Sequence, residues 1–277
     1  LYWLHDYFSI CPGYTLLRND VSFCGAPRVE SQACAVCVYG EARAEHVARM
    51  QKLFEDVSFK VVAPSALALD VWRSGSALRC QSEIVSAHCR LELRKTAADE
   101  INIVDNAPVR VAFLGIPTMR KGWNFFEKLV REIRADSEAV SSFEFYYFGN
   151  ECLNSGDITE IPVDVSRQNI HAMVAAVTAA RIDFVVLWSL WPETFSFTAH
   201  ESLAAGAYIL TGPDSGNIAR LASGAGRVFE SENALLSFLR SGDAQRLAAE
   251  RREKIMTGDL VFGRMSADIL QRQYEVG

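Results

Sequence analysis

The stretch at 182–210 is the part of the sequence that most restricts the fold. Ile182–Leu190 is a nearly continuous apolar run, which is typical of a strand buried on both faces of a parallel sheet. Pro192 ends this strand, and the residues from Ser196 have the apolar spacing of a helix that Gly206 suits as a C-terminal cap. The next four residues return to an apolar strand. This order predicts a strand, turn, helix and strand unit of a parallel α/β sheet.

Two carboxylates lie in this unit. Glu193 is on the turn and Glu201 is in the helix, eight residues later, so they are at most about 12 Å apart along the helix axis. The amides of Thr194, Phe195 and Ser196 open the helix, where N–H groups and the helix dipole favour an anion such as a diphosphate. The carboxylates would then accept hydrogen bonds from hydroxyls of a sugar and of a ribose. The alternative is a pair of solvated helix charges.

Composition narrows the class of protein. The 277 residues are 49% hydrophobic, which is enough for one large or two modest domains, and the net charge of −6 gives no basic surface for nucleic acid. No apolar run reaches the roughly 18 residues that span a bilayer, and nothing resembles a signal peptide. Seven cysteines are expected to stay reduced. We therefore predict a cytoplasmic protein, with or without peripheral contact to the inner face of a membrane.

A second strand and loop precede this unit. Val109–Gly115 is an apolar strand, and Arg120, Lys121 and Gly122 come just before a helix, which is a phosphate-binding arrangement with two cations. Gly149 ends another predicted strand. Strands that alternate with helices of this length predict two doubly wound, Rossmann-like domains that face a cleft. The expected domains are 1–105, 106–260 for nucleotide-sugar binding, and a C-terminal helix at 261–277 that returns to the first domain.

The phrase from Trp191 to Gly206 resembles the Glu-x7-Glu signature of retaining glycosyltransferases of family 4, which have the GT-B architecture. The resemblance implies that Glu193 contacts the transferred sugar and that Glu201 binds the ribose hydroxyls. It also implies that Lys121 neutralises the donor diphosphate and that Gly149 lies near the base. The family commonly has glycine where this chain has Ser196. The arginine that is usual in the family stands near the position of Ile116 in this chain. Arg120 is either the replacement of that arginine or an unrelated residue.

The first forty residues contain a further candidate site. His5 follows an apolar strand, and the His-Asp pair here resembles the family's, in which the histidine reaches the donor sugar. The alternative is that His5 only orients its loop, and His88 is interpreted as structural. Cys11, Cys24, Cys34 and Cys37 either surround a structural zinc or are packed or redox-labile thiols.

The resemblance implies transfer of a sugar from a nucleotide-diphosphate sugar, the co-substrate, to a glycan or lipid-linked glycan in polysaccharide or lipopolysaccharide assembly. No two aspartates are separated by one residue, so the Asp-x-Asp metal clamp is absent and we predict no catalytic metal or other catalytic cofactor. The rival functions are a nucleotide-sugar epimerase of GT-B shape and a non-catalytic nucleotide-sugar-binding module. Because the chain begins at Leu1 inside a predicted strand, we expect the first domain to be incomplete.

Overall fold

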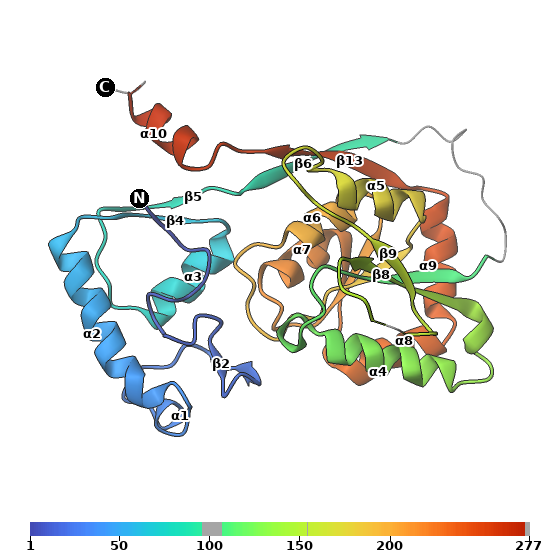
Figure 1. Cartoon of the computed structure of the whole chain (residues 1–277), viewed down its shortest axis with the longest axis horizontal. Helices are drawn as coiled ribbons and strands as arrows, with labels where there is room; N and C mark the ends of the chain where they lie inside the picture. The colour runs from blue at the N-terminus through green and yellow to red at the C-terminus, as the bar shows by residue number, and fades with distance from the viewer. Residues whose placement is uncertain (96–106, 154, 275–277) are drawn as a thin grey trace.

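The computed structural model describes residues 1–95, 107–153 and 155–274, which form two α/β units side by side (Figure 1). The first unit contains a parallel sheet of strand order β1-β4-β5. Its elements are β1 (Tyr2–Trp3), β2 (Leu17–Arg18), β3 (Ser22–Phe23), α1 (Gln32–Ala35), α2 (Gly40–Asp56), β4 (Lys60–Ala63), α3 (Ala66–Gly75) and β5 (Ser82–Val85). The side chains of Tyr7, Phe54 and Trp72 are buried between this sheet and its helices, so the unit has an aromatic core of its own.

The second unit is a six-stranded parallel sheet of order β12-β11-β10-β7-β8-β9. Counted within the unit, this is the 3-2-1-4-5-6 order of dinucleotide-binding domains. The strands are β7 (Val109–Leu114), β8 (Phe143–Gly149), β9 (Thr159–Pro162), β10 (Phe184–Val186), β11 (Tyr208–Thr211) and β12 (Gly226–Val228). The predicted doubly wound topology is therefore confirmed for this unit.

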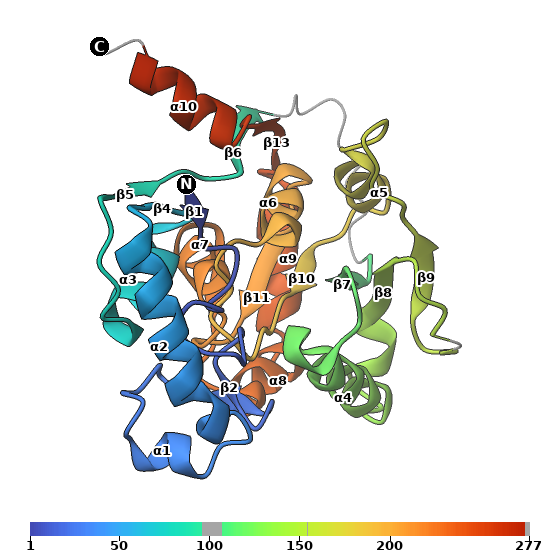
Figure 2. The same ribbon diagram turned by 60° about the vertical axis from the view of Figure 1, so that its left-hand side comes forward.

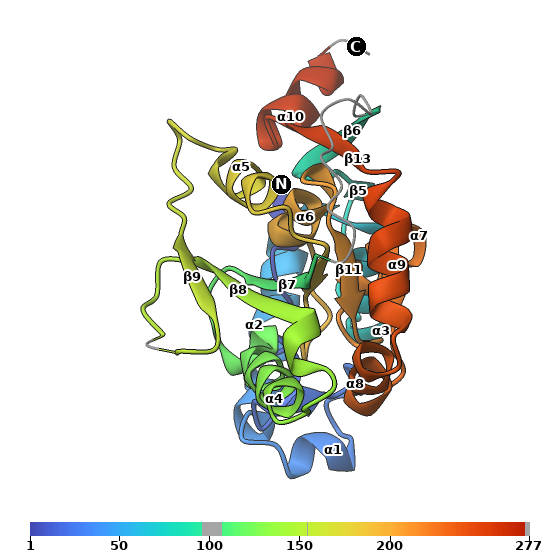
Figure 3. The same cartoon turned by 90° about the vertical axis from the view of Figure 1, so that its right-hand side faces the viewer.

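Helices cover both faces of this sheet because its strands are apolar on both sides (Figure 3). Along β7, Val111 and Phe113 face α4 (Trp123–Arg134), α8 (Glu232–Arg240) and α9 (Asp243–Arg252). Ala112 and Leu114 face the other core, which packs against α5 (Ala172–Ala179), α6 (Phe197–Ala204) and α7 (Asn217–Ala225). The 3-10 turns η2 (Met119–Lys121) and η3 (Val140–Ser142) flank α4. Gly206 ends α6 with φ +85°, as its sequence position predicts.

A two-stranded antiparallel ribbon was not predicted. Strand β6 (Cys89–Lys95) pairs with β13 (Met256–Phe262), and both strands pack on α6 (Figure 1). The C-terminal helix expected at 261–277 is observed as α10 (Ser266–Tyr274), which begins after β13. The expected linker at 94–107 lies mostly outside the described residues, and the domain boundary expected at 260 falls inside β13.

Helix α10 lies beside the amino terminus (Figure 2). The indole Nε1 of Trp3 donates a hydrogen bond of 2.9 Å to the Ser266 hydroxyl. The end of the described chain thus contacts the first unit directly. Of the helices in the described part of the chain, none is both long and apolar enough to cross a lipid bilayer.

Candidate active site

A small cavity lies at the carboxyl ends of β7 and β10, the two central strands between which the strand order of the sheet reverses. Leu114, Leu187 and Ser189 line it from the strand ends, and Lys121 and Glu193 line it from the loops that follow. Crevices at this switch point are where open α/β sheets bind their ligands. The topology therefore brings together the predicted Lys121 and Glu193, which are 72 residues apart in the sequence.

Gly122 is the residue that allows this approach. Its φ is +85°, and a Cβ atom at this position would lie 2.1 Å from the carbonyl oxygen of Trp188. The backbone here also accepts a hydrogen bond, because Leu190 N–H donates to the Arg120 carbonyl at 2.9 Å. The Lys-Gly step thus packs against the end of β10, and the lysine side chain reaches the turn that follows it.

The Lys121 Nζ atom is 3.1 Å from Glu193 Oε1. The glutamate side chain is 5% exposed and the lysine side chain 36% exposed, so the pair spans the cavity wall and its opening. The Ser189 hydroxyl donates a longer hydrogen bond of 3.5 Å to the same carboxylate oxygen. Solvent reaches the lysine, so the ion pair adds little stability, and the ammonium remains available to an anion in the cavity.

The first unit holds the Glu193 turn from the other side. The Tyr7 hydroxyl donates to the Pro192 carbonyl at 3.0 Å, and the Ser65 hydroxyl donates to the Thr194 carbonyl at 2.7 Å. The Thr194 hydroxyl in turn donates to the His5 carbonyl at 2.7 Å. Burial, with the nearby charge of Glu193, raises the pKa of Tyr7, which keeps this donor protonated. Three buried contacts therefore fix the turn between the two units.

Ser196 caps α6, and its hydroxyl accepts the Ala199 N–H at 3.2 Å. The helix begins at Phe197, so its first N–H groups belong to Phe197 and Thr198, later in the chain than the predicted Thr194, Phe195 and Ser196. The turn is longer than predicted because Thr194 is used in contacts with the first unit. Ser196 has φ −125°, an ordinary extended conformation, so the backbone of this structure does not require the glycine common in the family.

Glu201 is 5% exposed, and within the described residues its carboxylate has no hydrogen-bond partner. Burial raises its pKa from 4.5 to about 7. Buried polar groups normally have partners, because an unmet one costs about 1–3 kcal/mol. A carboxylate left in this state is suited to hydroxyl donors from a ligand.

The other predicted residues lie around this centre. Arg120 is directed away from it, since its guanidinium contacts the Tyr14 hydroxyl and lies 5.8 Å from the centre of the Tyr14 ring. Gly115 follows β7 with φ +91°, and Gly149 is the last residue of the neighbouring strand β8. Phe195 stacks on the His200 ring with centroids 4.4 Å apart. The His5 ring is exposed and stacks on Trp3, so it reaches the Glu193 turn only through its backbone.

Sequence reasoning missed Tyr7, Ser65 and Ser189 as contacts of the turn. The Ser65 hydroxyl also caps α3 by accepting the Ala68 N–H. Its bond to the Thr194 carbonyl has no local sequence signal, because the acceptor is 129 residues away. Gly216 packs against the backbone of Pro192 and Glu193, where a Cβ would lie 2.5 Å from Glu193 N.

Cys11, Cys24, Cys34 and Cys37 line one small cavity together with Arg43. They are thiols in this structure, and among the described residues no three His, Cys, Asp or Glu side chains are arranged to hold a metal ion. The Arg43 guanidinium donates to Cys34 Sγ at 2.7 Å and to the Ile10 carbonyl at 3.0 Å. The geometry favours the packed-thiol alternative over the zinc site.

No protein-family model matches the sequence, and no curated protein matches it. Solved structures do match. HepE from Anabaena, in complex with UDP and glucose, is 12% identical with a TM-score of 0.54, and the match covers 91% of this chain and 65% of HepE. Sucrose-phosphate synthase from Thermosynechococcus elongatus is 14% identical with a TM-score of 0.53, covering 90% of this chain and 65% of that one.

WaaG, a glycosyltransferase involved in lipopolysaccharide biosynthesis, is 14% identical with a TM-score of 0.51. That match covers 76% of this chain and 62% of WaaG. The chain thus spans less than two thirds of the length of these three proteins, and at such identities the likeness concerns the fold. The chain has two α/β units that both contact the turn at the switch point of a 3-2-1-4-5-6 sheet. This arrangement, together with the matches, identifies the fold of this chain as GT-B.

Proposed function

We propose that this chain is a glycosyltransferase of the family 4 type, which transfers a sugar from a nucleotide-diphosphate sugar to an acceptor with retention of configuration. The observation that carries the proposal is the arrangement at the switch point. The Lys121 and Glu193 ion pair lines the cavity, the first turn of α6 follows, and the buried Glu201 carboxylate lies on the same helix without a partner among the described residues.

The proposed donor lies along α6. The ribose hydroxyls donate to Glu201, which gives that carboxylate the hydrogen bonds it lacks. The diphosphate lies at the N–H groups that open the helix, beside the Lys121 ammonium, so that two sources of positive potential meet two negative phosphates. The sugar then lies toward Glu193. Gly115 and Gly149 lie at the strand ends beside the proposed nucleotide position, where Gly149 packs against the Tyr147 hydroxyl, and the role of Arg120 is limited to shaping this opening through Tyr14.

The reaction needs stabilisation of a departing diphosphate, for which positioned cations and helix amides suffice. The bond from the sugar C1 to the phosphate oxygen breaks, the acceptor oxygen bonds to C1 on the same face, and its proton passes to the leaving phosphate. Glu193 orients the sugar by accepting hydroxyl hydrogen bonds, because Lys121 and Ser189 already bind one of its oxygens. The proposed mechanism uses no catalytic metal, and His5 contacts the sugar.

The acceptor is proposed to be a glycan or lipid-linked glycan of a cell-surface polysaccharide or lipopolysaccharide. WaaG, of similar fold, acts in lipopolysaccharide biosynthesis. The proposed setting is the cytoplasm, at the inner face of a membrane where such an acceptor is held.

Calorimetric titration with UDP, GDP and ADP, followed by assays of cleavage of the matching sugar nucleotides, tests the proposal. We expect one of the three to bind, with Glu201→Ala weakening it by about 10- to 100-fold, the equivalent of about 1.5–3 kcal/mol for a charged hydrogen bond. Glu127→Ala, on the exposed side of α4, is the matched control and keeps the affinity of the unaltered protein. Binding of none of the three, or equal binding by both variants, would refute the proposed site. Tight binding without any cleavage or transfer would instead identify a nucleotide-sugar-binding module.

A further inference from the structure

Five aromatic side chains meet where the first unit touches the start of α6. Trp3 and His5 come from β1 and the residues after it, His88 from the connection between β5 and β6, and Phe195 and Phe197 from the residues around the start of the helix. The cluster therefore joins the two units directly beside the proposed sugar position.

His88 is the centre of this cluster. Its ring centroid is 5.4 Å from that of Trp3 and 5.3 Å from that of His5, in the first unit. It is also 4.9 Å from Phe195 in edge-to-face geometry and 5.7 Å from Phe197 in stacked geometry, in the second unit. No other ring in the cluster touches all four of the others within these distances. The contact between His5 and the helix start thus passes through His88.

The His88 ring is used as a flat surface and not as a hydrogen-bonding group. The residue is 7% exposed, and Nδ1 is enclosed with no partner among the described residues. Burial lowers its pKa to about 4, and the neighbouring His5 and His200 rings act in the same direction. The imidazole is therefore neutral near pH 7. A neutral flat ring can stack on both His5 and Phe197.

We propose that His88 is a positioning residue, whose ring holds His5 against the first turn of α6 and so sets the direction in which His5 meets the donor sugar. This inference rests on the proposed function, in which His5 contacts the sugar. His5 has an exposed ring that stacks on Trp3 and His88, and its backbone carbonyl accepts a hydrogen bond from Thr194 on the Glu193 turn. Without the His88 surface the ring is free to turn away from the cleft.

Loss of the His88 ring is expected to affect turnover more than nucleotide binding. The proposed diphosphate and ribose contacts come from Lys121, the N–H groups that open α6, and Glu201, whereas the contact of His88 with α6 is a ring stack on the Phe197 side chain. We therefore expect nucleoside diphosphate affinity to depend on His88 much less than turnover does. Cleavage of the sugar bond depends on it, because a misplacement of about 1 Å in a group facing the reacting centre can cost 100-fold in rate.

The test compares His88→Ala, His88→Leu and His88→Phe in the full chain. Alanine leaves a gap, leucine fills it without a flat surface, and phenylalanine restores the flat surface without nitrogen atoms. The assays are calorimetric binding of UDP and cleavage of UDP-glucose to UDP and glucose with water as acceptor, which needs no knowledge of the natural acceptor. His46→Ala is the control, since His46 lies in α2 and packs on Phe8, away from this cluster.

We expect kcat to fall about 10- to 100-fold in the alanine and leucine variants, with UDP affinity within about twofold of the unaltered chain. The phenylalanine variant retains kcat within about threefold, and His46→Ala matches the unaltered chain. Full turnover by His88→Leu would overturn the inference, and so would a phenylalanine variant as slow as alanine, since nitrogen would then be required. If the unaltered chain binds UDP and cleaves UDP-glucose while all variants equal it, only this inference fails. If the unaltered chain neither binds nor cleaves any sugar nucleotide, the proposed function fails as well.

Discussion

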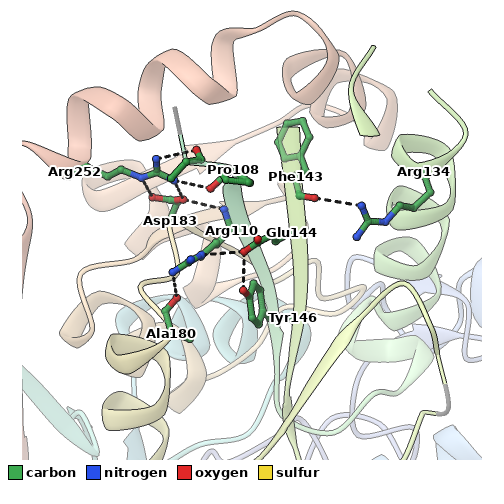
Figure 4. A network of polar contacts seen from close by, with 10 residues as sticks. Pro108, Arg110, Arg134, Phe143, Glu144, Tyr146, Ala180, Asp183 and Arg252 are labelled. Atoms are coloured by element: carbon green, nitrogen blue, oxygen red, sulfur yellow. Dashed lines mark hydrogen bonds and ion pairs between the residues drawn. The ribbon is translucent and has the colours of Figure 1, made fainter. Parts of the chain in front are cut away.

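The two ends of the six-stranded sheet differ in how completely their charged side chains are paired. At the amino ends of the strands, Asp183 accepts two hydrogen bonds from Arg252, at 2.8 and 2.6 Å, and one from the Arg110 N–H at 2.9 Å (Figure 4). Arg252 also donates to the Ala107 and Pro108 carbonyls, and Arg110 donates to Glu144. The charged groups in this network bind one another and the backbone, so the network is complete within the chain.

At the carboxyl ends of the strands, the charged side chains are not fully paired. Lys121 and Glu193 form one ion pair that is open to the cavity, and the carboxylate of Glu201 is buried without a partner among the described residues. Buried charge is expensive unless it is paired and hydrogen-bonded, so a chain selected only for stability would complete both ends. This difference supports the proposals that the amino end serves stability and that the carboxyl end binds a ligand.

Removing Asp183 is the largest expected perturbation of stability. Asp183→Ala leaves Arg252, whose side chain is 18% exposed, without its carboxylate, and we expect the free energy of unfolding to fall by about 3–5 kcal/mol. Urea denaturation measures this change. The matched control is Glu232→Ala, which breaks the more exposed Lys128 pair and costs less than about 1 kcal/mol. Similar losses for the two variants would contradict the structural role of the amino-end network.

Lys121 is expected to give the largest loss of activity. Lys121→Ala removes the cation beside the departing diphosphate, so kcat/KM for sugar-nucleotide cleavage should fall about 100- to 1000-fold, while stability changes little. Lys128→Ala, on the far side of α4, is the control for loss of a positive charge. Unchanged kcat/KM in Lys121→Ala would show that the carboxyl end is not where the leaving group is stabilised.

The pH dependence of nucleotide affinity sharpens the comparison further. The ribose hydroxyls donate to the ionised form of Glu201, and its pKa is about 7, so affinity should rise by about tenfold between about pH 6 and pH 8. The nucleotide itself titrates near this range, so the informative quantity is the difference between the unaltered chain and Glu201→Gln. Parallel pH profiles for the two proteins would exclude Glu201 from the binding step.

Glu201 also links stability to pH in the chain without ligand. Because its folded pKa is raised above the unfolded value of 4.5, the folded state binds more protons, so this contribution to stability is present below pH 4.5 and is lost as pH rises to about 7. The change is about 3–4 kcal/mol, from about 2.5 pKa units at 1.36 kcal/mol each. Thermal unfolding of the unaltered chain and Glu201→Gln should therefore diverge between pH 4.5 and pH 7 and keep a constant difference above pH 7, with the glutamine variant more stable.

Ser196→Gly gives the smallest expected effect. The substitution removes the hydroxyl that caps α6, and glycine is itself an acceptable N-cap, so stability should fall by only a few tenths of a kcal/mol. UDP affinity should stay the same or rise, since glycine matches the family's common residue. A loss of affinity above about tenfold would mean that the Ser196 hydroxyl binds the ligand itself.

Much of the second unit was predictable because its signals are local. The apolar run before Pro192, the helix that Gly206 ends and the Lys-Gly step before α4 each depend on residues within one turn or strand. Backbone sterics and apolar periodicity decide such elements, and the strand-helix alternation then predicts a parallel sheet. The separation of Glu193 and Glu201 by one short helix was likewise determined by sequence alone.

Only the tertiary structure decided which distant residues meet. The pairing of β6 with β13, the clasp of Tyr7 and Ser65 on the Glu193 turn and the central place of His88 all join segments more than 90 residues apart. A bond of this kind depends on how two units pack, and no local pattern specifies it. The protonation of Glu201 has the same origin. A carboxylate on a helix is ordinarily ionised at neutral pH. Packing of the β6–β13 ribbon on α6 buries Glu201, and this burial raises its pKa so that the carboxyl group is half-ionised near neutral pH.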